Sequence, residues 1–279
     1  MNNYGGYSSD QINNPMSGPT YYQPNQNWID WNKQPIQQVY QNFTYVQDPL
    51  SELSNATGCY IKQVPDYIEC LGKCCEKENQ YHVFANTPQG TKYLFKVQER
   101  SNCCCRVCCP ASNRSFKLEF KHIAAANDFM GGDFSNLFAR SEKECRCMVL
   151  CCCRPEMKTY KNQTNQELSK VVYPCTCCGL TFDIYEANAL KYIADVSCCQ
   201  CGVCCCSGCV KCYNVEIPIY AANNRSLAVG MILKKKYQNC GECCTAADTF
   251  EIVFPSTASA QDKFNIICAG IMIDYTKFE

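Results

Sequence analysis

The C-terminal segment of the chain, ASAQDKFNIICAGIMIDYTKFE, constrains the fold more than any other stretch. Between Ile266 and Ile273, apolar side chains occupy every side of a helix, a pattern typical of a helix that is buried all round. A helix that spans a membrane needs about 20 apolar residues, whereas this run is bounded by Lys263 and Asp274. The segment therefore predicts a core helix over residues 260–278.

The segments before this helix alternate apolar and polar residues with a period of two, which predicts half-buried strands. In SFKLEFK, Phe116, Leu118 and Phe120 alternate with charged residues, and YNVEIPIY has the same pattern. Similar runs are YHVFA, KYLFKV, LTFDIY, LKYIADV, SLAVGMIL and FEIVF. A sheet of many short strands that closes around one apolar helix has no exposed edge. We therefore expect a mostly β protein, built as a closed antiparallel barrel around the C-terminal helix.

Two parts of the chain share one order of features. YHVFANTPQGTKYLFKV, the cluster NCCCRVCC and SFKLEF match LTFDIYEANALKYIADV, the cluster CCQCGVCCCSGCVKC and YNVEIPIY. Each part predicts a hairpin, a cysteine-rich connection and a returning strand.

Residues 1–45 are rich in Asn, Gln, Tyr, Pro and Gly and carry few charges. Such a segment buries too little apolar surface to offset the entropy lost on ordering, so we predict a disordered tail before a domain at residues 46–279. The stretch GPTYYQPNQNW within it is a candidate ligand for adaptor partners.

Composition limits the functions open to the chain. Its 279 residues include 29 cysteines, and 26 Lys and Arg balance 26 Asp and Glu. With no net charge, no whole-protein field attracts nucleic acid, and no nucleic-acid partner is predicted. The start, MNNYGGYSSDQINNPM, lacks the basic and apolar regions of a secretory signal, so we expect reduced thiols in the cytosol. No Gly-rich phosphate loop and no Ser/His/Asp or Cys/His arrangement stands out, so ATP use and covalent catalysis are not expected.

Four motifs together resemble the phospholipid scramblase family. They are NCCCRVCC, RCMVLCCC, YPCTCCG, and the C-terminal AADTFEIVFP followed by the apolar helix and IDYTKFE. The resemblance implies a tubby-like barrel of about 12 strands around the C-terminal helix. It also implies ATP-independent, bidirectional movement of phospholipids between the leaflets of the plasma membrane, from its cytoplasmic face.

The resemblance further implies thioester-linked acyl chains on the motif RCMVLCCC. The positions so assigned are Cys147, Cys151, Cys152 and Cys153. Thiolates attack acyl donors, and the arginines on either side of the motif favour the thiolate form. We expect nearby Lys143, Lys158 and Lys161 to attract anionic headgroups. The alternative is that these cysteines are small buried side chains or unmodified thiols.

The tract from Cys198 to Cys212 contains several C-x2-C spacings. Cysteines at such spacings can hold zinc in a tetrahedral site, and the candidates here are Cys201, Cys204, Cys209 and Cys212. So dense a tract also produces these spacings by chance. His82 and His122 lie on predicted strands and are interpreted as ordinary strand residues.

The resemblance implies a calcium-binding loop before the C-terminal helix, but this chain lacks most of its carboxylates. The corresponding positions are Ala246, Asp248, Ser256, Thr257 and Ser259. Because calcium affinity rises with the number of carboxylates, Asp248 is predicted to be at most a weak calcium ligand. Alternatively, Asp248 is a turn or capping residue before TFEIVF. The run Lys234–Lys236 is interpreted as a solvated turn.

The sequence therefore predicts an acyl-anchored scramblase-like protein whose partners are membrane phospholipids. One alternative is a membrane-tethered lipid-binding or signalling adaptor that transports nothing. A second is a cysteine-rich zinc protein.

Overall fold

The computed structural model describes residues 44–45, 48–64, 77–109, 112–123, 136–146, 154–174, 180–196, 200, 203, 213–236 and 247–278. All of them lie in one compact unit, Trp31–Glu279. The acyl and zinc candidate cysteines and nearly all of the predicted N-terminal tail lie outside the described residues.

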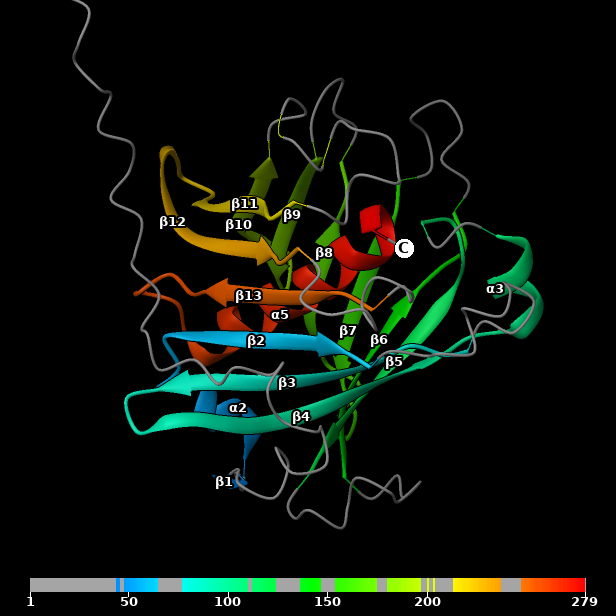
Figure 1. Cartoon of the computed structure of the whole chain (residues 1–279), viewed down its shortest axis with the longest axis horizontal. Coiled ribbons are helices and arrows are strands. Elements are labelled where there is room, and N and C mark those ends of the chain that lie inside the picture. The colour runs from blue at the N-terminus through cyan, green and yellow to red at the C-terminus, as the bar shows by residue number, and fades with distance from the viewer. Residues whose placement is uncertain are drawn as a thin grey trace, which may run out of the picture. The chain divides into compact units, whose positions relative to one another are not determined.

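Twelve antiparallel strands form the body of this unit (Figure 1). They are β2 (Gly58–Gln63), β3 (Gln80–Thr87), β4 (Gly90–Arg100), β5 (Phe116–His122), β6 (Leu137–Lys143), β7 (Glu156–Lys161), β8 (Glu167–Val172), β9 (Leu180–Glu186), β10 (Ala189–Val196), β11 (Val215–Ala221), β12 (Asn224–Lys234) and β13 (Thr249–Val253).

The sheet closes on itself. Each strand from β2 to β12 pairs with the next one in the chain, and β13 pairs with both β12 and β2. For example, Glu251 lies opposite Tyr60 between β13 and β2, and Val97 lies opposite Phe120 between β4 and β5. A short strand, β1 (Thr44–Tyr45), adds to β4 in parallel. The prediction of a closed antiparallel barrel of about twelve strands is confirmed.

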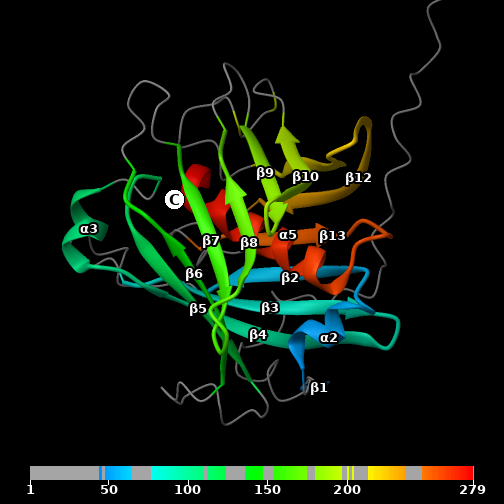
Figure 2. The same cartoon turned by 180° about the vertical axis from the view of Figure 1, so that it is seen from behind.

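One helix runs through the barrel (Figure 1, Figure 2). Helix α5 (Ala260–Ile273) continues as one π-helical stretch, η5 (Asp274–Phe278), so the predicted helix over residues 260–278 is confirmed. Ser259 begins it with a capping box, because its Oγ accepts from the Asp262 backbone N–H at 3.0 Å and Asp262 accepts from the Ser259 N–H at 3.0 Å. Every residue from Asp262 to Ile273 is buried, which explains why the sequence is apolar on all sides. Among the described residues, no helix is long and apolar enough to cross a membrane.

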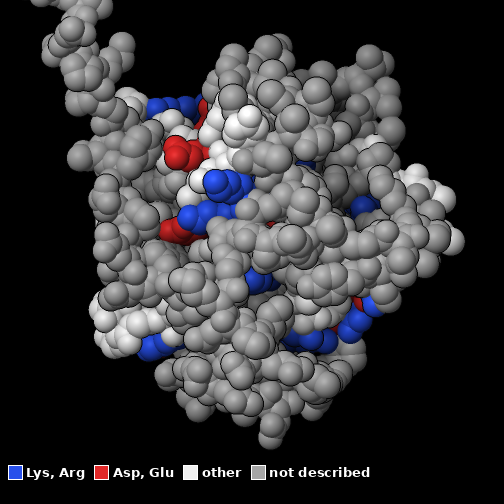
Figure 3. All heavy atoms as spheres, in the orientation of Figure 1, with Lys and Arg blue, Asp and Glu red and all other residues white. Residues whose placement is uncertain are grey.

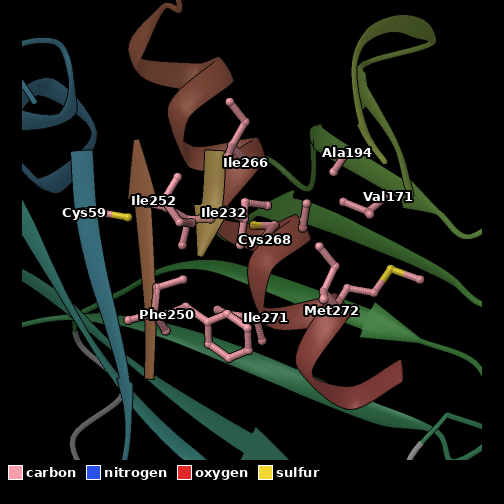
Figure 4. Close-up of a cluster of buried hydrophobic side chains, with 14 of the residues drawn as sticks. Cys59, Val171, Ala194, Ile232, Phe250, Ile252, Ile266, Cys268, Ile271 and Met272 are labelled. Atoms are coloured by element: carbon pink, nitrogen blue, oxygen red, sulfur yellow. The ribbon is translucent and has the colours of Figure 1, made fainter. Parts of the chain in front are cut away.

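Aliphatic side chains of the helix pack against the barrel wall (Figure 4). Ile266, Ile271 and Met272 are at most 1% exposed, as are Ile252 and Phe250 of β13. Gly270 faces the wall, and a Cβ there would lie 3.2 Å from Ile252 Cδ1 and 3.4 Å from Ile61 Cδ1. The absence of a side chain at Gly270 lets the strands approach the helix closely.

Strands β6 and β7 have small polar residues on their inner face. Ser141 and Thr159 hydroxyl oxygens lie 2.6 Å apart, and the Thr159 hydroxyl donates to Cys268 Sγ of α5 at 3.7 Å. All three residues are fully buried. Hydroxyls that bond each other can be buried at little cost, so this part of the wall needs no apolar alternation.

Two short helices lie between the strands. Helix α2 (Pro49–Leu53) follows Asp48, which caps it, and contacts α5 where Lys263 Nζ donates to the Ser54 carbonyl at 2.9 Å. Helix α3 (Cys103–Cys108) lies between β4 and β5.

The repeat predicted from the sequence is confirmed in its strands. Hairpin β3–β4 is followed by a cysteine-rich connection and β5, which returns against β4. Hairpin β9–β10 is likewise followed by a cysteine-rich connection and β11, which returns against β10.

Candidate functional site

The strand order places the cysteine-rich connections at one end of the barrel. Because successive strands alternate in direction, every second connection begins and ends at the same rim. The connections at one rim are residues 64–79, 101–115, 144–155, 173–179, 197–214 and 235–248, and they contain every cysteine except Cys59 and Cys268. The connections at the other rim contain none. We name the first rim the cysteine end; the C-terminus of the chain, marked in Figure 1, lies on the same side.

The candidate acylation residues Cys147, Cys151, Cys152 and Cys153 belong to the connection between β6 and β7 but lie outside the described residues. The residues on either side are described. Cys145 is exposed, and Arg146 donates to the Arg154 carbonyl at 3.1 Å across the base of the connection. The segment therefore starts and ends at adjacent points of the cysteine end.

The lysines expected to help that motif bind headgroups are not equivalent. The Lys158 side chain is 42% exposed and pairs with Glu156 at 3.2 Å, and Lys161 is exposed. Lys143 is only 2% exposed, so its assignment to a surface basic group was wrong. Residues Ala139, Ser141 and Lys143 alternate along β6, and all three point inward.

The zinc candidates Cys201, Cys204, Cys209 and Cys212 also lie outside the described residues, in the connection between β10 and β11. Within the part of the chain that the structure describes, no group of three or more His, Cys, Asp or Glu could hold a metal ion. Both histidines lie on strands, His82 on β3 and His122 on β5, as expected.

Helix α3 presents thiols at the cysteine end that the sequence reasoning did not assign. Asn102 caps the helix by accepting from the Cys104 N–H at 2.8 Å. Cys103, Cys104 and Cys108 are exposed. The cap fixes where the run NCCCRVCC starts its helix, but nothing in the local pattern distinguishes these cysteines from those of the other connections.

A cluster of buried charges lies under the cysteine end, between the wall and the last turn of the central helix. Lys234 Nζ lies 2.8 Å from Asp248 Oδ1, and both side chains are at most 1% exposed. The ring of Phe278 lies 5.0 Å from the same Nζ. The interpretation of Lys234 as part of a solvated turn was therefore wrong. Lys234 continues the inner face of β12 after Ile232, a period-two signal that could have placed it inside.

Asp274, at the start of η5, completes this cluster. Its Oδ2 accepts from the Tyr81 hydroxyl at 2.9 Å, and its side chain is fully buried. Burial, and then the neighbouring Asp248 carboxylate, raise the pKa of Asp274 well above its ordinary range. Protonated Asp274 is therefore favoured, and Asp248 is the anion that balances Lys234.

A second buried carboxylate ties the same turn to the barrel. Glu99 Oε2 accepts from the Tyr275 hydroxyl at 2.8 Å and from the Asn79 N–H at 2.9 Å. Gln63 connects the two parts, since it donates to Asn79 Oδ1 at 2.8 Å and accepts from the Asp248 N–H at 3.0 Å. These contacts fix η5 against β2, β3 and β4.

Two residues at the positions of the calcium loop, Asp248 and Ser259, have structural roles in the fold. Asp248 directly precedes β13 with its carboxylate inside the barrel next to an ammonium group, and Ser259 is the cap of α5. Glu251 pairs with Lys235 at 2.6 Å. Calcium binding at Asp248 stays a prediction.

The fold defines a class: a closed antiparallel barrel filled by its C-terminal helix, with the cysteine-rich connections attached at one rim. A family model described as Scramblase matches residues 37–279, and the chain belongs to this family. It is 25% identical to phospholipid scramblase 1 of Rattus norvegicus, with 73% of this chain and 55% of that protein aligned. Phospholipid scramblase 1 of Mus musculus is also 25% identical, with 56% of its length aligned. The chain thus spans about half the length of the curated relatives it matches. No solved structure matches the chain significantly.

Proposed function

We propose that this protein moves phospholipids between the leaflets of the plasma membrane without ATP, held at the cytoplasmic face by acyl chains on Cys147, Cys151, Cys152 and Cys153. Its membership of the Scramblase family and its distant similarity to phospholipid scramblase 1 support the proposal. The observation that carries the acyl anchor is that all the cysteine-containing connections begin and end at one rim of the barrel.

Cysteine-containing connections at a single rim of the barrel suit membrane attachment. Acyl chains attached at any of the connections of the cysteine end would enter the same leaflet. Each buried methylene contributes about 0.8 kcal/mol, and one chain alone gives only marginal binding, whereas two give stable anchoring. Cysteines spread over both rims could not all reach one bilayer surface.

The adaptor alternative is favoured by a separate observation. The barrel interior is filled by α5, whose residues from Asp262 to Ile273 are all buried. A lipid headgroup therefore has no route through the described barrel, and any transport must use its outer surface or the bilayer around it. A protein that only binds membranes, with adaptor partners on its N-terminal tail, needs no such route.

Vesicles that contain the purified protein and a fluorescent phospholipid distinguish the two functions. A membrane-impermeant reductant bleaches the outer leaflet only, about half of the signal; transport of lipid raises the bleached fraction towards completeness. Bleaching that stops at half, in vesicles shown to hold folded protein, would leave the adaptor function. Runs with and without calcium, and measurement of zinc in protein purified under reducing conditions, test the two cofactor predictions.

The anchor has its own test in cells. Hydroxylamine cleaves thioesters, so it should release the wild-type protein from membranes. Cys→Ala at positions 151, 152 and 153 should release it without treatment, whereas Cys→Ala at the buried Cys59 should not. Membrane attachment that survives both treatments would contradict the acyl anchor.

A further inference from the structure

A cavity of about 510 Å³ opens at the cysteine end, at the ends of β4, β5 and β6 and beside Asn102, the cap of α3. Its volume falls within the usual range for small-ligand sites. Phe116 is the one apolar residue among the ten that line it, and the other nine are polar or charged. All lining residues belong to the described part of the chain.

Lys143 is the unusual member of this lining. Its side chain is 2% exposed. Nζ donates to the Arg114 carbonyl at 2.7 Å and lies 5.4 Å from the Phe116 ring centroid. Among the residues that the structure describes, no carboxylate oxygen lies within ion-pair distance of Nζ. A buried ammonium without a counter-ion is costly, and a bound anion would remove that cost.

The carboxylates around the cavity are engaged elsewhere. Glu78 pairs with Arg100 at 3.1 Å, and Glu142 pairs with Lys117 at 3.2 Å. Glu144 pairs with Arg146 at 3.5 Å. On the face drawn in Figure 3, basic and acidic side chains of the described residues lie next to each other in places. Of the three cations in the lining, Lys143 alone lacks an acidic partner among the described residues.

Other cations lie close to Lys143 and reinforce the positive charge. Burial first, and then the nearby Arg114 and Arg146 guanidinium groups, lower the pKa of Lys143 to about 8. Cys145 acts in the opposite direction. Two guanidinium groups near a buried ammonium make a site suited to an anion with several acceptor oxygens, as a phosphate group has.

We propose that this cavity binds a phosphate group, with Lys143 as the buried cation that recognises it. Two ligands carry such a phosphate group: a phospholipid, in the phosphodiester of its headgroup, and free phosphate. The headgroup is the source expected if the cysteine end faces the membrane, and this step rests on the proposed function.

The test uses the full chain in reducing buffer, titrated by calorimetry with inorganic phosphate and, separately, with a dihexanoyl phosphatidylserine solution below its micellar concentration. The variant is Lys143→Met, whose unbranched side chain is one atom shorter than that of lysine and carries no charge, so it should fold. Lys191→Met is the matched control, since Lys191 lies outside this cavity, its side chain is 44% exposed and it pairs with Glu186 at 3.0 Å. We expect saturable binding to the wild type, a loss of about tenfold or more in Lys143→Met, and a change of less than about twofold in Lys191→Met.

Each outcome has one meaning. Binding of phosphate alone supports the site and assigns free phosphate; binding of the short-chain lipid supports the site and assigns the headgroup. No binding of either, or unchanged binding to Lys143→Met, overturns the proposal. If Lys143→Met does not fold, the wild type with 15N-labelled lysine side chains replaces it: phosphate must shift the NMR signal of Lys143 Nζ and not that of Lys191 Nζ, and an unchanged Lys143 signal overturns the proposal. Phosphate binding without lipid transport in vesicles would contradict the proposed function and still support this site.

Discussion

At the scale of single residues, the interior of this barrel contains charges that its walls compensate. Lys234 and Asp248 form an ion pair at 2.8 Å with no solvent contact, and Asp274 lies beside them. Removing both ends of such a pair is often tolerated, whereas removing one end leaves a buried charge without its partner. This asymmetry gives the clearest predictions for individual side chains.

Asp248→Ala is expected to lower the free energy of unfolding by about 3–5 kcal/mol, because it takes the counter-ion from buried Lys234. Urea unfolding followed by circular dichroism measures the loss. The double variant Asp248→Ala, Lys234→Met should recover much of the lost stability. Lys236→Ala is the control: Lys236 is exposed and lies two residues after Lys234, so its removal should change the stability little. An Asp248→Ala protein as stable as the wild type would mean that the pair contributes nothing.

The raised pKa of Asp274 predicts that the free energy of unfolding depends on pH. Its pKa is raised in the fold by burial and by Asp248, so the folded state holds a proton that the unfolded state releases. Its contribution is therefore present below about pH 4, the range of the unfolded carboxyl, and is lost as pH rises towards the folded pKa. Asp274→Asn imitates the neutral form, so its stability relative to the wild type should increase as pH rises from 4 to 8. A constant difference between the two proteins over that range would show that Asp274 does not take up the proton.

At the scale of elements, the central helix and the strands were not equally predictable. The helix is apolar on every side, and eight strands show clear alternation, so these could be read directly. Strands β2, β6, β7 and β8 were not identified individually. On β6 and β7 the inner positions include Ser141 and Thr159, which bond each other rather than pack as apolar groups, so hydropathy gave no signal. On β2 nearly every residue is buried, so no alternation exists.

Ile271→Asp tests the place of the helix. Ile271 is 1% exposed and belongs to the core of Figure 4, so a carboxylate there would be buried without a partner. The expected cost of several kcal/mol is comparable with the whole stability of a domain, about 5–15 kcal/mol, and the variant should be unfolded or insoluble. Thr276→Asp places the same charge on a half-buried residue of the next turn and should remain folded. A folded, monomeric Ile271→Asp protein would contradict a helix enclosed by the barrel.

At the scale of the whole molecule, the barrel separates its cysteines into two populations. Cys59 and Cys268 are fully buried, and burial raises the pKa of Cys268 to about 12 and that of Cys59 well above its ordinary value. The described thiols of the cysteine end include exposed Cys103, Cys104, Cys108 and Cys145. Their burial and their raised pKa both disfavour reaction of Cys59 and Cys268.

Iodoacetamide should therefore label exposed Cys103, Cys104, Cys108 and Cys145 of the reduced, folded protein at pH 8 and leave Cys59 and Cys268 unmodified until denaturant is added. Peptide mass spectrometry over a time course measures each rate, and the denatured protein is the control in which all should react. Fast labelling of Cys268 in the folded state would indicate that the barrel opens around α5.

The sequence by itself determined that the chain would build a closed antiparallel barrel around its last helix, because alternation and all-round apolarity are local properties. Only the tertiary structure decided which charges lie inside. Tyr81 and Asp274 are 193 residues apart in the sequence, and the hydrogen bond from Tyr81 offsets part of the cost of burying Asp274. No local sequence pattern predicts that these two residues meet. The same holds for the cysteine end. The sequence shows cysteine clusters at intervals, and the alternating direction of the strands brings their connections to one rim.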